Sequence, residues 1–198
     1  HEQGITLDSA YLATISVTMH TELDLLADRI YEAAGTTFNL NSPKQLGEVL
    51  FDRLGLKPKQ QKKTAGGARS TKESELEKMR DLHPIIPDIM RYRELQKLVS
   101  TYIDNLPTYV ASDGRIHTTF IQTGAATGRM ASQNPGLQNI PVRTQESRAI
   151  RRAFVAAPGY TLVSIDYSQI ELRVAAILSG DAKLVEIFKR GEDVHTCL

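Results

Sequence analysis

The sequence has one cysteine, Cys197, and no long hydrophobic run. A single thiol cannot form an internal disulfide framework or a zinc site with several thiolate ligands, and such cysteine usage is typical of a reducing compartment. A membrane helix needs roughly 18 or more consecutive apolar residues, and no signal peptide is readable at the N-terminus. These absences favour a cytoplasmic protein. Because the chain begins with His1 and not with Met, we also expect it to be a piece of a longer protein.

Net charge is small, +1 over 198 residues, but the charged residues are unevenly distributed. Residues 57–72 contain six basic residues and no acidic one, and a second basic cluster consists of Arg143, Arg148, Arg151 and Arg152. Basic clusters can neutralise the phosphates of a nucleic acid and release its counterions. Either cluster alone could equally be a solvated loop or a charged strand edge. The two clusters therefore make nucleic acid a candidate partner but do not establish it.

Periodic spacing predicts that residues 8–105 are helical, with the basic loop at one end. Apolar residues recur three or four positions apart through residues 11–33, and Gly35 offers a left-handed stop. Capping-box patterns predict two further helix starts. These pairs are Ser42 with Gln45 and Ser70 with Glu73. A last helix of about 18 residues is predicted after Pro84. Its apolar face consists of Ile85, Ile89, Tyr92, Leu95, Val99 and Tyr102.

The pattern becomes β-rich after Leu106. Asp113-Gly114 and Pro158-Gly159 each separate two short strand-like runs, which indicates hairpins. Residues 123–144 are rich in Gly, Asn, Gln, Ser and Pro, and a loop of this length in a compact domain usually binds something. Two helical patterns close the sequence. The sequence therefore predicts an α+β fold, in which a helical part is followed by an antiparallel sheet.

The stretch TLVSIDYSQIELR, residues 161–173, raises the question of catalysis. The run TLVSI predicts a strand through residues 161–165, and Asp166 follows at its carboxyl end, where ligands and metals are commonly held. Ser168 with Glu171 fits a capping box, which would stabilise a helix start by about 1 kcal/mol. Taken alone, both carboxylates have structural explanations as good as catalytic ones.

Several motifs, in their order along the chain, resemble DNA polymerase family A. DYSQIELR is similar to the first palm motif of the family, TGR and LQNIPVR are similar to its template and primer contacts, and GEDVHT follows in the expected place. The similarity extends to FNLNSPKQLGEVLFDRLGL, YRELQKLVSTYIDNLP and GRIHTTFIQT, and so to essentially the whole chain. The resemblance implies a right-hand polymerase. Residues 1–105 would be the helical thumb with a basic tip loop at 57–72, and residues 106–198 the N-terminal part of an incomplete antiparallel-sheet palm.

The resemblance also implies template-directed DNA synthesis by two Mg²⁺ ions. Asp166 would be the catalytic carboxylate that binds metal, with the backbone carbonyl of Tyr167 as a further ligand. Carboxylate oxygens suit magnesium, which stabilises the charge that builds up when the primer 3′-hydroxyl attacks the α-phosphorus. Glu171 is similar to the sugar-selecting residue of the family, which excludes a ribose 2′-hydroxyl. His195 is similar to the histidine near the incoming deoxynucleoside triphosphate.

The DNA contacts implied by the resemblance lie in two regions. Arg129 resembles the family's arginine at the primer terminus, and Gln138 and Asn139 resemble residues that line the minor groove, where side-chain donors test base-pair geometry without reading sequence. The thumb tip would grip duplex phosphates. Its predicted DNA-binding residues are Lys57, Lys59, Lys62, Lys63 and Arg69. Arg143 and Arg152 could equally be solvated.

Two catalytic segments of the family have no counterpart after Asp166, namely the nucleotide-binding helix and the hairpin with the second metal carboxylate. We therefore expect the chain alone not to polymerise. The implied partners are primer–template DNA, deoxynucleoside triphosphates and the remaining palm and fingers segments, with no membrane, in the nucleoid region of the cytoplasm. Two alternatives stay open. One is a non-catalytic DNA-binding module, which would not need Asp166 or Glu171. The other is a related single-subunit RNA polymerase, which Glu171 disfavours.

Overall fold

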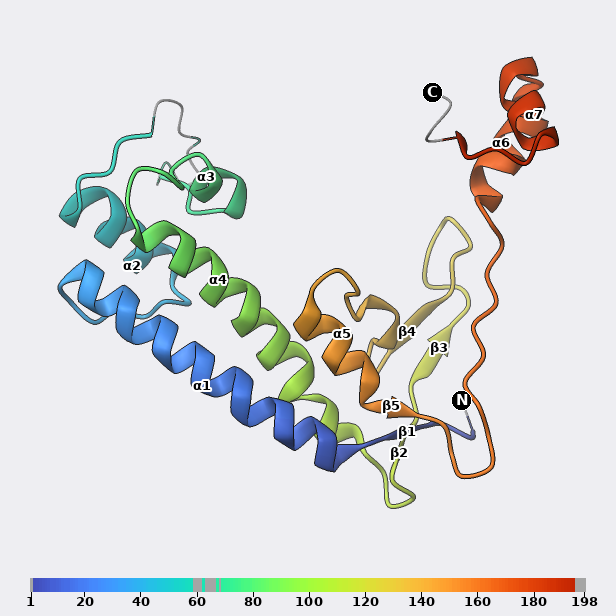
Figure 1. Cartoon of the computed structure of the whole chain (residues 1–198), viewed down its shortest axis with the longest axis horizontal. Helices are drawn as coiled ribbons and strands as arrows, with labels where there is room; N and C mark the ends of the chain where they lie inside the picture. Colours follow the sequence, from blue (N-terminus) through green and yellow to red (C-terminus); the bar gives the residue numbers. More distant parts are fainter. Residues whose placement is uncertain (1, 59–61, 63–66, 68, 195–198) are drawn as a thin grey trace. The chain divides into compact units, whose positions relative to one another are not determined.

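The computed structural model describes residues 2–58, 62, 67 and 69–194. The chain forms two compact units, residues 1–160 and residues 161–198. Helices predominate and the strands are short and antiparallel, so the α+β class predicted from the sequence is confirmed (Figure 1). None of the described helices is both long enough and apolar enough to span a bilayer.

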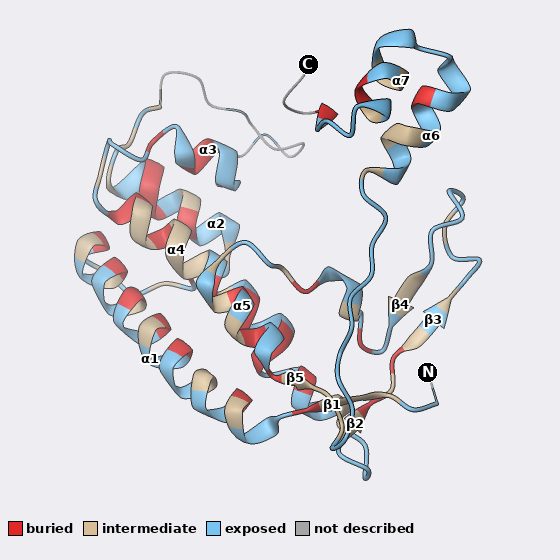
Figure 2. Cartoon of the chain, turned by 45° about the vertical axis from the view of Figure 1, so that its right-hand side comes forward, coloured by how far each residue is buried: buried red, intermediate tan, exposed pale blue. Residues whose placement is uncertain are grey.

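The larger unit is built on two long helices that pack along each other, α1 (Ser9–Ala34) and α4 (Ile85–Leu98) (Figure 1). Asp8 caps α1 because its side chain accepts a hydrogen bond from the backbone N–H of Tyr11. Gly35 ends the helix in the left-handed conformation, which glycine adopts without a steric penalty. The inward stripe of α1 is buried, as its spacing predicts (Figure 2). Its members are Leu12, Met19, Leu23, Leu26, Ile30 and Ala34.

The helix predicted after Pro84 is also confirmed. α4 continues directly into the π-helical turn η2 (Val99–Ile103), and a 3-10 turn, η3 (Leu106–Tyr109), follows. The predicted apolar face is buried except for Tyr92, which is half-buried. Its buried members are Ile85, Ile89, Leu95, Val99 and Tyr102.

Three short helical elements pack at the far end of the helical pair. They are α2 (Pro43–Gly47), the π-helical η1 (Glu48–Arg53) and α3 (Glu73–Glu77). Ser42 caps α2 as predicted, but the side chain of Gln45 accepts a hydrogen bond from the backbone N–H of Asn39. The predicted capping box between Ser42 and Gln45 is therefore only half present.

The capping box predicted for Ser70 and Glu73 is wrong. The residue before α3 is Lys72, and no side chain caps this helix. Ser70 is buried, and its hydroxyl accepts a hydrogen bond from the backbone N–H of Lys72 at 3.3 Å. Since a serine hydroxyl can bond to the backbone two residues ahead in a turn, this local bond takes the place of the capping bond. The helix is short and ends at Glu77.

Among the described residues of the larger unit, five short strands form two antiparallel sheets. The strands are β1 (Ile5–Leu7), β2 (Arg115–Ile116), β3 (Thr119–Ile121), β4 (Ala131–Gln133) and β5 (Phe154–Val155). β1 lies between β2 and β5, and β3 pairs with β4. The turn predicted at Asp113-Gly114 is present, because the backbone N–H of Ala111 donates to the carbonyl of Arg115 at 2.8 Å. The predicted loop 123–144 includes β4 and a 3-10 turn, η4 (Leu137–Asn139).

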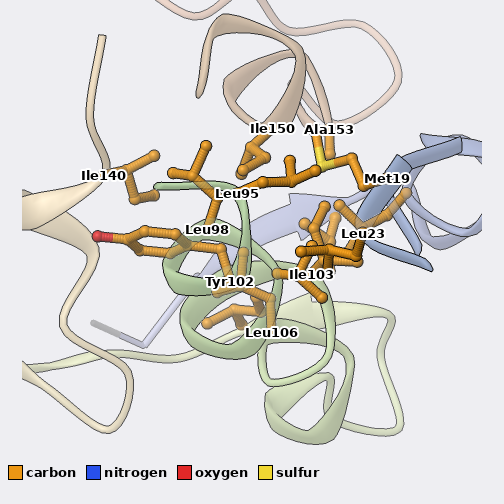
Figure 3. Packing of buried hydrophobic residues seen from close by; sticks show 14 of the residues in the cluster. Met19, Leu23, Leu95, Leu98, Tyr102, Ile103, Leu106, Ile140, Ile150 and Ala153 are labelled. Carbon is orange, nitrogen blue, oxygen red and sulfur yellow. The ribbon is translucent and has the colours of Figure 1, made fainter. Parts of the chain in front are cut away.

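A hydrophobic core joins the helical pair to the residues between β4 and β5. Ile150 and Ala153, which lie in and just after α5 (Gln145–Arg152), pack with residues of α1, α4 and η2 (Figure 3). Ile140, directly after η4, belongs to the same core. A second core surrounds α2, η1 and α3. Packing is thus continuous across residue 105, and the thumb and palm bounds of 1–105 and 106–198 stay predictions.

The smaller unit confirms the two closing helices but not the strand before them. α6 (Ile170–Ser179) and α7 (Ala182–Lys189) pack together. Residues 161–167 form no strand, and the side chain of Ile165 is 92% exposed. The hairpin predicted around Pro158-Gly159 is therefore wrong: β5 pairs with β1, and no described strand pairs with residues 161–167. An alternating apolar run predicts a strand only where a neighbouring strand can satisfy its N–H and C=O groups.

The capping box predicted for Ser168 and Glu171 is also wrong. The residue before α6 is Gln169, which has a positive φ of 51°, and no side chain caps the helix. The carbonyl of Ser168 instead accepts a hydrogen bond from Nε of Arg173 at 2.9 Å. Glu171 lies in the first turn of α6, where a carboxylate interacts favourably with the helix dipole.

Candidate nucleic-acid interface and metal ligands

A groove of about 950 Å³ lies in the larger unit between the α3–α4 region and residues 139–147. Its lining has more positive than negative side chains. The cationic residues are Arg80, Arg91, Arg93, Lys97 and Arg143, and the acidic ones are Glu73, Glu77 and Glu94. A concave surface with an excess of positive charge suits a polyanionic ligand.

Some of the basic side chains in the groove already have a partner within the chain, and others do not. Arg93 donates a hydrogen bond to the carbonyl of Thr71, and burial lowers the pKa of Arg93. Arg80 pairs with Glu77 at 3.1 Å. Lys97 and Arg143 are exposed, and among the residues that the structure describes neither has an ion pair. These two side chains are therefore the ones available to an external anion.

The backbone of the LQN segment is held at three points. The Tyr102 hydroxyl donates to the carbonyl of Asn139 at 2.7 Å, and Nη1 of Arg151 donates to the carbonyl of Ile140 at 3.0 Å. The backbone N–H of Gln138 donates to the hydroxyl of a serine on β4 at 3.2 Å. The side chains of Gln138 and Asn139 are exposed, so the fold fixes their backbone and leaves their amides accessible.

Arg129 is not one of the residues that line the groove. It is exposed and follows a turn in which the backbone N–H of Gly128 donates to the carbonyl of Ala125 at 3.0 Å, between β3 and β4. Gly128 has a positive φ of 74°, which most other residues would adopt only with strain. Neither Arg129 nor Gln138 lines the groove, whereas Asn139 does.

The predicted basic tip is only partly within the described residues. Lys59 and Lys63 lie outside them, and Lys57 is exposed. The backbone N–H of Lys62 donates to the carboxylate of Glu75 at 3.1 Å. Glu75 is buried, and hydrogen bonds from Lys78 and from the Lys62 backbone lower its pKa. Sequence reasoning did not single out Glu75 as the residue that holds the basic segment at Lys62.

Arg69 has partners within the chain. Its guanidinium forms an ion pair with Asp52 and lies 4.6 Å from the centre of the Phe51 ring. Both contacts tie the end of the basic segment to η1. A guanidinium that already pairs with a carboxylate has less to gain from a phosphate than a solvated one, because the existing pair must first be broken. Its predicted role in DNA binding stays a prediction.

The predicted metal ligands lie in the smaller unit. Asp166 and Tyr167 are exposed and immediately precede the turn into α6. That turn is held by the bond from Arg173 to the Ser168 carbonyl, and Nε2 of Gln169 donates to Oδ1 of Asp193 at 2.8 Å. Glu171 is exposed, and His195 lies outside the described residues.

Arg173 has a second contact, since its guanidinium lies 4.7 Å from the centre of the Phe188 ring on α7. The ring and the Ser168 carbonyl together fix this guanidinium, which therefore links the motif turn to α7. In the described part of the chain, no three acidic or histidine side chains gather as metal ligands would. Asp166 can thus supply one ligand, and a complete site needs others.

Residues 9–198 match the model of DNA polymerase family A. This chain belongs to that family. The thermostable DNA polymerase I of Thermus thermophilus is 53% identical over 194 residues, which cover 98% of this chain and 23% of the relative. The DNA polymerase I of Chloroflexus aurantiacus is 52% identical over 195 residues, 97% of this chain and 21% of the relative. The chain thus spans less than a quarter of the length of these curated relatives.

One solved structure is similar over nearly the whole chain. The structure described as the POL domain of Pol1 from M. smegmatis in complex with DNA primer-template and dNTP has a TM-score of 0.87 and 43% sequence identity. The similarity covers 98% of this chain and 34% of that one. The family predicted from the motifs is therefore confirmed. The roles of individual residues stay predictions.

The groove cations of α4 are functional candidates that sequence reasoning missed. Arg93 and Lys97 are four residues apart, so they lie on one face of α4, away from buried Leu95 and Leu98. The spacing is visible in YRELQK, residues 92–97. However, an isolated pair of basic residues on a helix most often lies on a face that is simply solvated. What distinguishes this pair is that Arg143, 46 positions beyond Lys97, lines the same groove.

Replacing Tyr102 by Phe tests the bond that fixes the LQN segment. The change removes the donor to the Asn139 carbonyl and keeps the ring in the core, so we expect the free energy of unfolding to fall by about 1 kcal/mol. Urea denaturation measures this, and amide exchange at residues 137–140 should quicken. Tyr109→Phe is the control, because no hydrogen bond from that hydroxyl is found among the described residues. Equal effects of both changes would contradict the assigned bond.

Proposed function

We propose that this chain is the thumb and the first part of the palm of a template-directed DNA polymerase. The observation that carries the proposal is the family match over residues 9–198, with DYSQIELR intact. The similar M. smegmatis structure is described as a complex with DNA primer-template and dNTP. We propose the same classes of ligand here, namely primer–template DNA and deoxynucleoside triphosphates. Residues 1–105 act as the thumb and residues 106–198 as the first part of the palm.

DNA binding in this proposal combines phosphate contacts with minor-groove contacts. Lys97 and Arg143 in the groove bind backbone phosphates, which gives affinity that does not depend on sequence and falls with salt. Gln138, Asn139 and Arg129 offer donors to minor-groove acceptors, which lie in similar places in every correct base pair. The tip residues bind phosphates of the duplex farther along. These are Lys57, Lys59, Lys62, Lys63 and Arg69.

Asp166 and the backbone carbonyl of Tyr167 are the proposed Mg²⁺ ligands. Both supply the oxygen donors that this cation prefers, and both residues are exposed, so the donor set fits the ion. A second carboxylate from outside the described residues completes a two-ion site. When bound, the ions supply stabilisation of the charge on the attacking and leaving oxygens. Asp166 contributes the negative charge that holds them, and the turn fixed by Arg173 and Gln169 orients it.

Glu171 and His195 act on the incoming nucleotide in this proposal. Glu171, in the first turn of α6, occupies the space that a ribose 2′-hydroxyl would need, and His195 lies beside the triphosphate. The remaining palm and fingers segments supply the other nucleotide contacts. For that reason residues 1–198 alone do not extend a primer, and measurable extension by them would contradict this part of the proposal. A cytoplasmic location, with the nucleoid, follows from the proposed function.

The catalytic role of Asp166 is tested in a chimeric polymerase. Residues 9–198 replace the matching segment of the Thermus thermophilus enzyme, and magnesium-dependent primer extension is measured. We expect Asp166→Asn to reduce the extension rate by about 100-fold or more while the chimera still binds primer–template, since charge stabilisation is lost and the DNA contacts remain. Glu186→Gln, an exposed change on α7, is the control. Unreduced extension by Asp166→Asn would remove Asp166 from the active site. A chimera that binds primer–template and never extends would favour the non-catalytic binding module.

Sugar selection by Glu171 is tested in the same chimera. Glu171→Ala removes the side chain that blocks the 2′-hydroxyl, so the ratio of kcat/KM for deoxynucleotides to that for ribonucleotides should fall by about 10-fold or more. Single-nucleotide insertion with matched dNTP and rNTP pairs measures the ratio. Glu171→Asp keeps the charge on a shorter side chain, and we expect an intermediate ratio. An unchanged ratio in Glu171→Ala would reject the assignment.

A further inference from the structure

Arg91 on α4 is surrounded by three carboxylates from three different helices. Its Nε donates to Oε1 of Glu22 on α1 at 2.8 Å, and its Nη2 donates to Oε1 of Glu146 on α5. A longer contact of 3.5 Å joins Nη1 to Glu94 on α4 itself. One guanidinium thus connects α1, α4 and α5, which lie beside one another in the larger unit (Figure 1).

The charges of this cluster support one another. Burial alone would lower the pKa of Arg91 and raise that of Glu146. Hydrogen bonds and charge attraction between them outweigh burial, so the pKa of Arg91 is raised and that of Glu146 is lowered. The side chains of Arg91 and Glu146 are 31% and 23% exposed, so the pair is partly shielded from water and from salt. It stays ionised at neutral pH.

Glu146 lies close in sequence to residues 138–143, the segment that is proposed to face the DNA. It is in the first turn of α5, whose capping box is made by Thr144 and Ser147. Thr144 directly follows Arg143, which lines the groove. At the other end of α5, Arg151 holds the carbonyl of Ile140. The segment from Gln138 to Arg143 is therefore tied to α5 at Ile140 and at its last residue. The contact of Glu146 with Arg91 anchors α5 to α4.

Arg91 also lines the groove, so two roles compete. As a phosphate ligand it would have to leave Glu22 and Glu146, two carboxylates already within hydrogen-bond distance. Lys97 and Arg143 have no such partners in the described part of the chain and meet a phosphate at lower cost. The shape of the guanidinium also favours the tether, since its donors lie in a fixed plane and can join two carboxylates at once.

We propose that Arg91 is a positioning residue, which ties α5 to α1 and α4 and thereby holds residues 138–143 in place for the DNA duplex. This inference rests on the proposed function, because the role of those residues is to bind primer–template. Arg91 acts through Glu146 and does not contact the DNA.

The test compares two carboxylates beside the same guanidinium. Glu146→Ala and Glu94→Ala each remove one negative charge near Arg91, but only Glu146 connects α4 to α5. Binding of the full chain to a fluorescent primer–template duplex is measured by anisotropy at several salt concentrations. We expect Glu94→Ala to bind as tightly as wild type or slightly tighter, because a repulsive charge is lost. Glu146→Ala should bind about 3- to 10-fold more weakly than Glu94→Ala, with the salt dependence unchanged.

A phosphate-binding Arg91 predicts the opposite pattern. Both alanine variants would then free the guanidinium and tighten binding, and the salt dependence would steepen. Arg91→Lys separates the roles again, since lysine keeps the charge for a phosphate but cannot bridge two carboxylates in the same way. The positioning role predicts weaker binding by Arg91→Lys with an unchanged salt slope, and full affinity would overturn it.

Amide exchange without DNA separates this inference from the proposed function. The backbone N–H groups of Thr144, Ser147 and Arg148 report on the first turn of α5. We expect faster exchange there in Glu146→Ala and wild-type exchange in Glu94→Ala. If the tether is confirmed in this way but the wild-type chain binds no duplex, the proposed function fails and the structural link stands. Wild-type exchange in Glu146→Ala contradicts the link itself.

Discussion

The packing of Ile150 and Ala153 against α1, α4 and η2 is the contact on which the rest of the larger unit depends. The apolar faces of α1 and α4 pack against each other. The contact of Ile150 and Ala153 joins that helical pair to a segment of short strands and turns, which has little core of its own. Ile140 enters the same core (Figure 3), and this fixes the backbone beside it, whereas the side chain of Asn139 is exposed. Without this contact, the bonds of Tyr102 to Asn139 and of Arg91 to Glu146 would be left to hold this wall of the groove to the helical pair.

The basic side chains of this groove fall into two groups, those with a partner within the chain and those without an ion pair among the described residues. Arg80, Arg91 and Arg93 have partners within the chain, so they mainly set the shape of the walls. Lys97 and Arg143 have no ion pair in the described part of the larger unit, and they give the groove its capacity for an anion. The sequence shows five equivalent cations, whereas the structure separates them by what each already contacts. The same reasoning applies to Arg69, whose contacts with Asp52 and Phe51 could not be seen in a basic run.

Local signals predicted the positions of the long helices, because each of them follows the period of its own apolar residues. Asp8, Gly35 and Pro84 lie at helix ends for reasons that neighbouring residues supply. One miss was a case in which a distant partner decides. Residues 161–165 have the apolar pattern of a strand, but no described strand lies beside them. The capping box predicted for Ser70 failed for a local reason, because its hydroxyl bonds to the backbone of Lys72. The motifs identified the family, yet they could not show that Tyr102 and Arg151 hold the LQN backbone, since those residues are up to 37 positions away from the ones they hold.

The central claim is that the groove of the larger unit binds duplex phosphates through Lys97 and Arg143. The most direct measurement is the slope of log K against log salt concentration for binding of the chain to a primer–template duplex. Each phosphate contact contributes a slope of about −0.9, so Lys97→Ala and Arg143→Ala should each make the slope shallower by about 0.9, and the double variant by about 1.8. Lys44→Ala, on α2 and outside the groove, should leave it unchanged. A wild-type slope in the double variant would contradict the account.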